Sequence, residues 1–290
     1  MAENAGSATR VVVVGTGAIG SAVARRLLAA GRAVVVWNRT GGRHTELVRA
    51  GALPAGSVRE AALSGELILL TLTDYAAVGQ CLEQLDGDLT GRTIVAMCTG
   101  TASDARRSAE RVAELGAHYL DAGIQTSPDA IDAAAGTILY GGSRRAYEQH
   151  RSTLALLGEP RFVGDTPEAA AVWDLALFGL WYDAQLGLLR ALDTVREAGI
   201  DVAEFARTAG PQLGHVVTGV PGTVAELLRS SYPAGPADLA GHLGVVRHLI
   251  ELRSDRGLGD GGLSIVAARM EALIADGRGG EGLTATIGYR

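Results

Sequence analysis

A glycine-rich hexapeptide between an apolar run and a helical stretch constrains the fold of this chain more than any other feature. Val11–Val14 is a run of four valines, typical of a strand buried on both faces of a sheet. The helical stretch Ser21–Ala30 and a second apolar run, Ala33–Trp37, come later. Between the first run and the helix lies the hexapeptide Gly15-Thr16-Gly17-Ala18-Ile19-Gly20. This order of strand, loop, helix and strand predicts a βαβ unit that binds a dinucleotide.

The three glycines of the hexapeptide have separate tasks in such a unit. Gly15 permits the tight turn, Gly17 lets the backbone approach a pyrophosphate, and Gly20 allows the helix to pack closely on the strand. The pyrophosphate then meets backbone N–H groups at the positive end of the helix dipole. We therefore expect all six residues of the loop to contact the cofactor.

The end of the second strand indicates which dinucleotide is preferred. A site for NADH places Asp or Glu there to bind the ribose 2′-hydroxyl, but this chain has Asn38-Arg39-Thr40. Asn38 and Thr40 can donate to a 2′-phosphate, and Arg39 can pair with it and stack on adenine. Arg43 adds a second positive charge. The sequence therefore predicts NADPH as the cofactor, and Leu72, Thr73 and Thr99 are predicted to contact it as well.

Composition excludes several other classes of protein. The 290 residues carry a net charge of −6, which argues against a nucleic-acid partner. The two cysteines, Cys81 and Cys98, have no spacing typical of a disulfide framework or a metal site. No apolar run is long enough for a membrane span, and no signal peptide is visible. We expect a soluble cytoplasmic protein without a metal.

Alternation of strands and helices up to about residue 165 predicts a parallel Rossmann sheet with helices on both faces. A stretch free of proline, 168–197, then predicts one long interdomain helix. The later segments read as separate helices, and the glycine-rich end reads as a mobile tail. The fold class is α/β, with a nucleotide-binding domain over 1–165 and a helical domain over 166–290. The predicted later helices are Ala203–Ala209, Thr223–Ser230, Pro236–Arg256 and Leu263–Asp276.

Several segments together resemble the 3-hydroxyacid dehydrogenase superfamily, and most closely its NADPH-dependent imine reductase branch, which includes reductive aminases. The resemblance covers nearly the whole chain. Its opening motif is shared by many dehydrogenases, whereas Trp-Asp-Leu-Ala-Leu at 173–177 is more discriminating. The segments that carry it are 11–40, Leu72-Thr73-Asp74-Tyr75, Thr99-Gly100-Thr101, Tyr119-Leu120-Asp121 and 173–177.

The hydroxyacid branch and this chain differ at three positions. By resemblance, Asp174 stands where hydroxyacid dehydrogenases carry a catalytic lysine, and Phe178 stands where they carry an asparagine. Gln125 replaces their serine. An ammonium group would repel an iminium cation, whereas a carboxylate attracts it and, when protonated, can supply a proton. Asp174 also interrupts an apolar run, where a carboxylate is costly unless it is paired or functional.

The resemblance implies further site residues and an assembly. Tyr182 follows Asp174 by about two helical turns and is predicted to hydrogen-bond the substrate nitrogen or to orient Asp174, with a core aromatic as the alternative. Gln125, Phe178 and Leu227 are assigned to the substrate pocket. Arg247 either pairs with an acidic group of the substrate or forms a salt bridge with Glu251. The family forms homodimers with exchanged C-terminal helices.

Three functions are compatible with these features. The first is NADPH-dependent reduction of imines or iminium ions, with Asp174 as proton donor or iminium-stabilising carboxylate. The second is an NADP-dependent dehydrogenase of the 3-hydroxyacid type, for which we find no suitable proton-handling group. The third is a non-catalytic NADPH-binding protein, because a fold alone does not select a chemistry.

Overall fold

The computed structural model describes residues 10–288 and divides the chain into two compact units. The first unit ends at Gly179, and the second begins at Leu180. The division falls inside one long helix, α8 (Ala169–Glu197).

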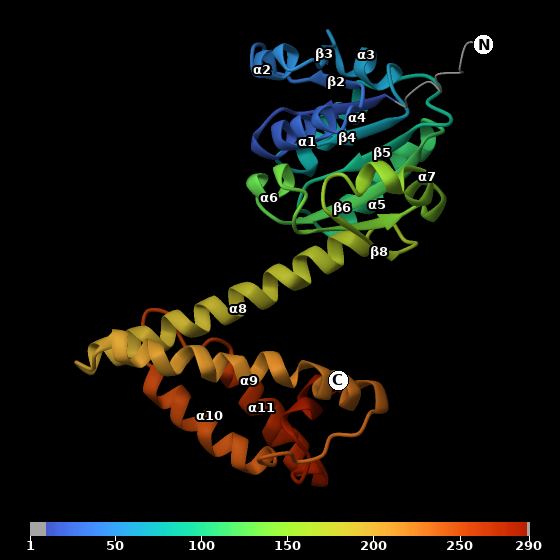
Figure 1. The fold of residues 1–290 in the computed structure, drawn as a ribbon. Coiled ribbons are helices and arrows are strands. Elements are labelled where there is room, and N and C mark those ends of the chain that lie inside the picture. Colours follow the sequence, from blue (N-terminus) through green and yellow to red (C-terminus); the bar gives the residue numbers. More distant parts are fainter. Residues whose placement is uncertain (1–9, 289–290) are drawn as a thin grey trace. The chain divides into compact units, whose positions relative to one another are not determined.

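The first unit is built on an eight-stranded sheet with the order β3-β2-β1-β4-β5-β6-β7-β8 (Figure 1). The pairs from β3 to β6 are parallel, β6 and β7 are antiparallel, and β7 and β8 are parallel. This is the Rossmann strand order with an extension at one edge, which confirms the predicted fold class. The strands are β1 Val11–Val14, β2 Val34–Trp37, β3 Leu53–Pro54, β4 Leu67–Leu70, β5 Thr93–Ala96, β6 His118–Gln125, β7 Thr137–Gly142 and β8 Glu159–Gly164.

Helices cover both faces of the sheet, and the valine run of β1 explains why. Val11 and Val13 belong to the apolar core under α1, α2, α6 and α7, whereas Val12 and Val14 belong to the core under α3, α4 and α5. Successive side chains of a strand point to opposite faces, so a strand covered on both sides needs apolar residues throughout. The helices are α1 Ala18–Ala29, α2 Thr45–Arg49, α3 Val58–Leu63, α4 Tyr75–Glu83, α5 Ala102–Glu114, α6 Pro128–Asp132 and α7 Arg144–Leu154.

Several short elements of the first unit were absent from the sequence-based prediction. These are β3, α3, α6, α7 and β8, each of which has a short or mixed pattern. Ser57, Ser127 and Ser143 nevertheless cap the three helices by accepting a backbone N–H three residues later. Thr101 caps α5 in a capping box with Asp104.

The second unit is helical, and one of its helices corrects the prediction. The structure has a single helix, α9 (Val202–Arg229), where two separate helices were expected. Pro211 and Pro221 lie inside it. A proline removes one backbone donor and usually breaks or kinks a helix, but α9 continues through both.

The remaining helices of this unit enclose a small core. They are α10 (Leu239–Arg253) and α11 (Leu263–Leu273), followed by a π-type turn over Ile274–Arg278 and a 3-10 helix over Leu283–Gly288. Leu239, Met270 and Ala285 are buried together. Because Ala285 packs into this core, the glycine-rich end is ordered as far as Gly288, and the prediction of a mobile tail was wrong for that part. Among residues 10–288, no helix has the length and hydropathy that crossing a bilayer requires.

Candidate active site

The glycine loop between β1 and α1 adopts the close packing that its sequence predicts. Gly15 has a φ of +95°, which favours glycine, and a Cβ at this position would collide with the carbonyl oxygen of Thr71. A Cβ on Gly20 would collide with the carbonyl oxygen of Gly15 and with the Thr71 hydroxyl. Both glycines are therefore needed for α1 to begin this close to the sheet.

Two polar side chains hold the loop in place. The Thr71 hydroxyl, at the end of β4, donates to the carbonyl oxygen of Gly15 at 2.7 Å. The Asn38 side chain accepts from the N–H of Thr16 at 3.0 Å and donates to the carbonyl oxygen of Thr40 at 2.9 Å. Asn38 therefore braces the phosphate loop against the end of β2, and a direct contact between Asn38 and a 2′-phosphate stays a prediction.

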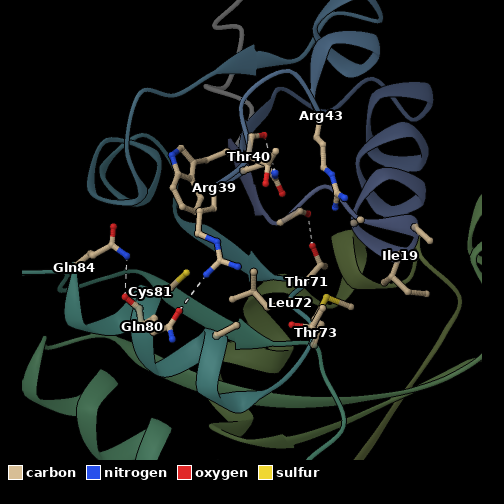
Figure 2. A pocket seen from close by; sticks show the side chains of 18 residues that line it. Ile19, Arg39, Thr40, Arg43, Thr71, Leu72, Thr73, Gln80, Cys81 and Gln84 are labelled. Carbon is tan, nitrogen blue, oxygen red and sulfur yellow. Dashed lines mark hydrogen bonds between the residues drawn. The ribbon is translucent and has the colours of Figure 1, made fainter.

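A cavity of about 360 Å³ opens above this loop (Figure 2). One face of α4 forms a wall of this cavity that the sequence reasoning missed. Its residues are Ala77 and, three, four and seven positions later, Gln80, Cys81 and Gln84, which therefore share one face of a helix. Arg39 crosses toward this wall and donates to the Gln80 side chain at 3.3 Å. The predicted residues that line the cavity are Gly15, Gly17, Ala18, Ile19, Gly20, Asn38, Arg39, Thr40, Arg43, Leu72 and Thr73. The others are Trp37, Thr71, Ala77, Gln80, Cys81, Gln84 and Met97.

The cavity fits a dinucleotide that carries an extra phosphate. A Cβ on Gly17 would meet no atom within 4 Å, so the backbone is open to a ligand at this point. The Thr16 hydroxyl is buried and has no partner among the described residues, which leaves it available to a phosphate oxygen. Arg39 and Arg43 are exposed at the same cavity, and no lining residue is acidic. The residues present therefore suit the phosphates of NADPH.

Asp174 lies in the first unit on α8 and is almost completely buried, with 1% of its surface exposed. Its Oδ2 accepts from the Thr99 hydroxyl at 3.0 Å, and its Oδ1 accepts from the Gln125 side-chain amide at 2.6 Å. Gly123 makes room for this carboxylate, because a Cβ there would lie 2.7 Å from Oδ1. The structure thus brings together Asp174, Thr99 and Gln125, three residues that the sequence singled out separately.

The environment of Asp174 has two opposing effects on the pKa of its carboxyl group. Burial raises the pKa of the carboxyl group, and the hydrogen bonds from Gln125 and Thr99 lower it, with burial the larger effect. The net pKa is therefore above the ordinary value. A carboxyl group of this kind holds a proton more readily than an exposed one, yet its two donors still stabilise the anion.

The remaining predicted residues lie in other places. Phe178 is half-buried on α8 within the first unit. Tyr182, Leu227 and Arg247 belong to the second unit, where Tyr182 stacks edge-to-face on Trp181 with ring centroids 4.9 Å apart. Tyr182 is 56% exposed and is therefore not a core aromatic within that unit.

Arg247 forms a salt bridge, but its partner differs from the expected one. It donates to Glu271 of α11 at 2.9 Å and not to Glu251 on its own helix. The expectation of a pair within the helix was wrong because α10 and α11 pack side by side, and Glu271 is brought within reach by that packing.

A phosphate loop on a Rossmann sheet, together with a buried carboxyl group that accepts two side-chain hydrogen bonds, is typical of a dinucleotide-dependent oxidoreductase. Residues 10–165 match the NAD-binding domain of 6-phosphogluconate dehydrogenase, and residues 166–289 match the C-terminal domain of NADPH-dependent reductive aminase-like proteins. The NADPH-dependent reductive aminase of Aspergillus oryzae is 29% identical over 96% of this chain and 95% of its own length.

Solved structures agree with these matches. An imine reductase from Pseudomonas sp. is 31% identical and has a TM-score of 0.84, covering 97% of this chain and 99% of the other. An imine reductase from Aspergillus terreus, solved with NADPH4 and dibenz[c,e]azepine, is 32% identical with a TM-score of 0.88, over 97% and 99% of the two chains. This chain belongs to the family of NADPH-dependent imine reductases and reductive aminases.

Proposed function

We propose that this protein reduces imines and iminium ions to amines, with NADPH as the reductant. The observation that carries the proposal is the buried carboxyl group of Asp174. By resemblance, Asp174 occupies the position at which hydroxyacid dehydrogenases carry a lysine. Two solved structures of a reductive aminase from Aspergillus terreus support it. One is in complex with NADPH and ethyl levulinate, and the other is in complex with NADPH4, cyclohexanone and allyl amine. NADPH supplies the hydride when it is bound.

The residues of the first unit divide the work between binding and charge. Gly17, which lines the cavity, and the unpartnered hydroxyl of Thr16 bind the pyrophosphate at the start of α1. Arg39 and Arg43 bind the 2′-phosphate. Asp174 attracts the positive charge of an iminium nitrogen, and in its protonated form it donates a proton to a neutral imine nitrogen.

At about 4 Å and an effective dielectric constant near 20, opposite unit charges attract by about 4 kcal/mol, and like charges repel by the same amount. A lysine in the place of Asp174 would therefore reverse the preference for a cationic substrate. Thr99 and Gln125 keep the carboxyl group in one orientation, because each oxygen accepts a hydrogen bond from one of them.

The test is a comparison of two substrates with two variants. Wild-type protein, Asp174→Ala and Asp183→Ala are each mixed with NADPH and 2-methyl-1-pyrroline, and cofactor absorbance is followed. Asp183 lies on the same helix and is exposed, so it provides the matched control. We expect turnover by the wild type and by Asp183→Ala, and a loss of at least tenfold in Asp174→Ala.

The same proteins are also given a 3-hydroxyacid with NADP⁺. Oxidation of the hydroxyacid without reduction of the imine would contradict the proposal and favour a hydroxyacid dehydrogenase. Tight binding of NADPH without turnover of any imine in a broad panel would favour a non-catalytic protein.

The assembly and the domain boundary extend this proposal. We propose a homodimer in which the C-terminal helices of one chain complete the cleft of the other. Its support is the row of exposed apolar side chains on α9, where Val216, Val217 and Leu228 are between 66% and 82% exposed. We also propose that the helical domain begins near residue 166. The substrate contacts of Tyr182, Phe178 and Leu227 stay predictions. The cytoplasmic location stays a prediction as well.

A further inference from the structure

One face of β6 is built to receive the start of α8. Residues 121, 123 and 125 alternate along the strand and therefore share a face. Gln125 donates to Asp174, and Gly123 leaves room for the Asp174 side chain. The third position is Asp121, a carboxylate with 1% of its surface exposed, for which the proposed reaction has no use.

The side chain of Asp121 reaches the first turn of α8. The backbone N–H of Ala171, which precedes Asp174 by about one helical turn, faces this carboxylate and lowers its pKa. Gly141 lies directly opposite Asp121 on β7, and a Cβ there would lie 2.7 Å from the backbone nitrogen of Ala170. A carboxylate at a helix N-terminus stabilises the free N–H groups and the helix dipole.

Two tyrosines form hydrogen bonds with the carboxylate of Asp121. The hydroxyls of Tyr75 and Tyr119 both donate to its Oδ1, and the two hydroxyl oxygens lie 3.2 Å apart. The ring of Tyr75 also packs against Gly100, where a Cβ would collide with it. Gly100 follows Thr99, which donates to Asp174. The same carboxylate is thus connected to both sides of the Asp174 site, through α8 and through the loop after β5.

We propose that Asp121 is a positioning residue for Asp174, which it fixes by anchoring the first turn of α8 through Ala171 while Tyr75 and Tyr119 hold its carboxylate. This inference rests on the proposed function, because it assigns Asp121 a task in the same reaction. Asp121 itself does not touch the substrate.

The groups that face Asp121 also couple it to pH. They are Tyr75 from α4, Tyr119 from its own strand, the Cys98 thiol from the loop after β5, and Asp174 from α8. Burial raises the pKa of Asp121 to about 7, the tyrosine and Ala171 hydrogen bonds oppose this, and the charge of Asp174 adds to it. Near neutral pH the carboxyl group therefore changes charge beside the Asp174 site.

The experiment compares Asp121→Ala, Asp121→Asn and Tyr75→Phe with the wild type in the full-length protein. Tyr140→Phe is the matched control, because Tyr140 is fully buried on the neighbouring strand and its hydroxyl has no partner among the described residues. Turnover is measured with an N-methylated cyclic iminium salt, whose charge does not depend on pH. NADPH affinity and amide hydrogen exchange of residues 170–174 are measured in parallel.

We expect Asp121→Ala to lower kcat at least tenfold with less than a threefold change in the Kd of NADPH, and to accelerate exchange at residues 170–174. Asp121→Asn retains an acceptor for Ala171 and resembles the protonated acid, so it should stay within threefold of the wild type below pH 7. In the wild type kcat/KM should rise through about pH 7, and Asp121→Asn should lack this rise. Tyr75→Phe should lower kcat a few-fold, and Tyr140→Phe should not.

Equal losses of kcat and NADPH affinity in Asp121→Ala, or wild-type exchange at residues 170–174, would overturn the proposal. If Asp121→Ala does not fold, an unchanged pH profile in Asp121→Asn would overturn it. Should the wild type reduce no imine, the proposed function fails while the exchange measurement still decides whether Asp121 anchors α8.

Discussion

At the scale of single residues, the site depends as much on missing atoms as on present ones. Asp174 is held by two donors, and the space for its carboxyl group exists only because residue 123 has no Cβ. The resemblance located Asp174 and Gln125 from the sequence. The contact between Thr99 and Asp174 was not predicted, because these residues are 75 positions apart and only the fold brings them together.

Gly123→Ala should lower kcat for imine reduction at least tenfold without a matching loss of NADPH affinity. The added Cβ would lie 2.7 Å from Oδ1 of Asp174, so the carboxyl group must move away from Gln125. Steady-state kinetics and a fluorescence titration with NADPH check this. Gly187→Ala is the control, because a Cβ on Gly187 meets nothing within 4 Å. Wild-type kcat in Gly123→Ala would show that the position of the carboxyl group is not critical.

The raised pKa of Asp121 predicts how folding stability depends on pH. Its pKa of about 7 in the folded state lies above the unfolded value of about 3.9, so the folded state binds the extra proton. The contribution to stability is present below the unfolded pKa and is lost as the pH rises toward 7. At about 1.4 kcal/mol for each pH unit, the loss is at most about 4 kcal/mol.

Asp121→Asn lacks this titration, so its stability relative to the wild type should increase by a few kcal/mol between pH 4 and pH 8. Denaturant unfolding at a series of pH values measures the difference. The exposed Asp165 provides the control variant Asp165→Asn. A constant difference between Asp121→Asn and the wild type across this range would mean that Asp121 is already ionised when the protein is folded at low pH.

At the scale of elements, the phosphate loop was predictable and the wall opposite it was not. The loop has a local sequence pattern with a fixed geometry, and its glycines take the predicted positions. The wall is one face of α4, where Ala77, Gln80, Cys81 and Gln84 are ordinary helix residues. Their role follows only from the fold, which places this face of α4 at the cavity beside Arg39. The two prolines of α9 show the opposite situation. Proline is a strong local signal for the end of a helix, but α9 continues through both of them.

Arg39→Ala should weaken binding of NADPH about ten- to hundredfold and leave binding of NADH nearly unchanged. A hydrogen bond to a charged group contributes about 1.5–3 kcal/mol, and only NADPH offers the 2′-phosphate. Titration with each cofactor measures both constants. Arg49→Ala provides the control, because Arg49 is exposed on α2 and does not line the cavity. An equal loss for NADPH and NADH would assign Arg39 to the adenine and not to the phosphate.

At the scale of the whole molecule, the α/β class and the helical second half were predictable because buried strands and long helices have strong periodic patterns. The short edge strands β3 and β8 carry little pattern and were missed. The packing of the C-terminal residues was missed for another reason, since the burial of one alanine, Ala285, orders a segment whose composition is typical of a flexible tail.

The proposed homodimer makes a prediction at this scale. A charge at an exposed apolar position of α9 should weaken association, so Val217→Asp combined with Leu228→Asp should convert dimers to monomers and reduce imine turnover. Sedimentation velocity measures the oligomeric state. Leu53→Asp, at an exposed apolar position of β3, is the control. A wild-type protein that sediments as a monomer at micromolar concentration would contradict the proposal.

The three glycines that face the start of α8 also set a limit for protein engineering. Gly123, Gly141 and Gly164 each lie so close to this helix that a Cβ would fall within 2.7 Å of Asp174, Ala170 or Ala169. A library that randomises these positions to enlarge the range of accepted imines should consist mostly of inactive members. Phe178 and Leu227, which are predicted to contact the substrate, are partly exposed, so larger or smaller residues are more easily accommodated there.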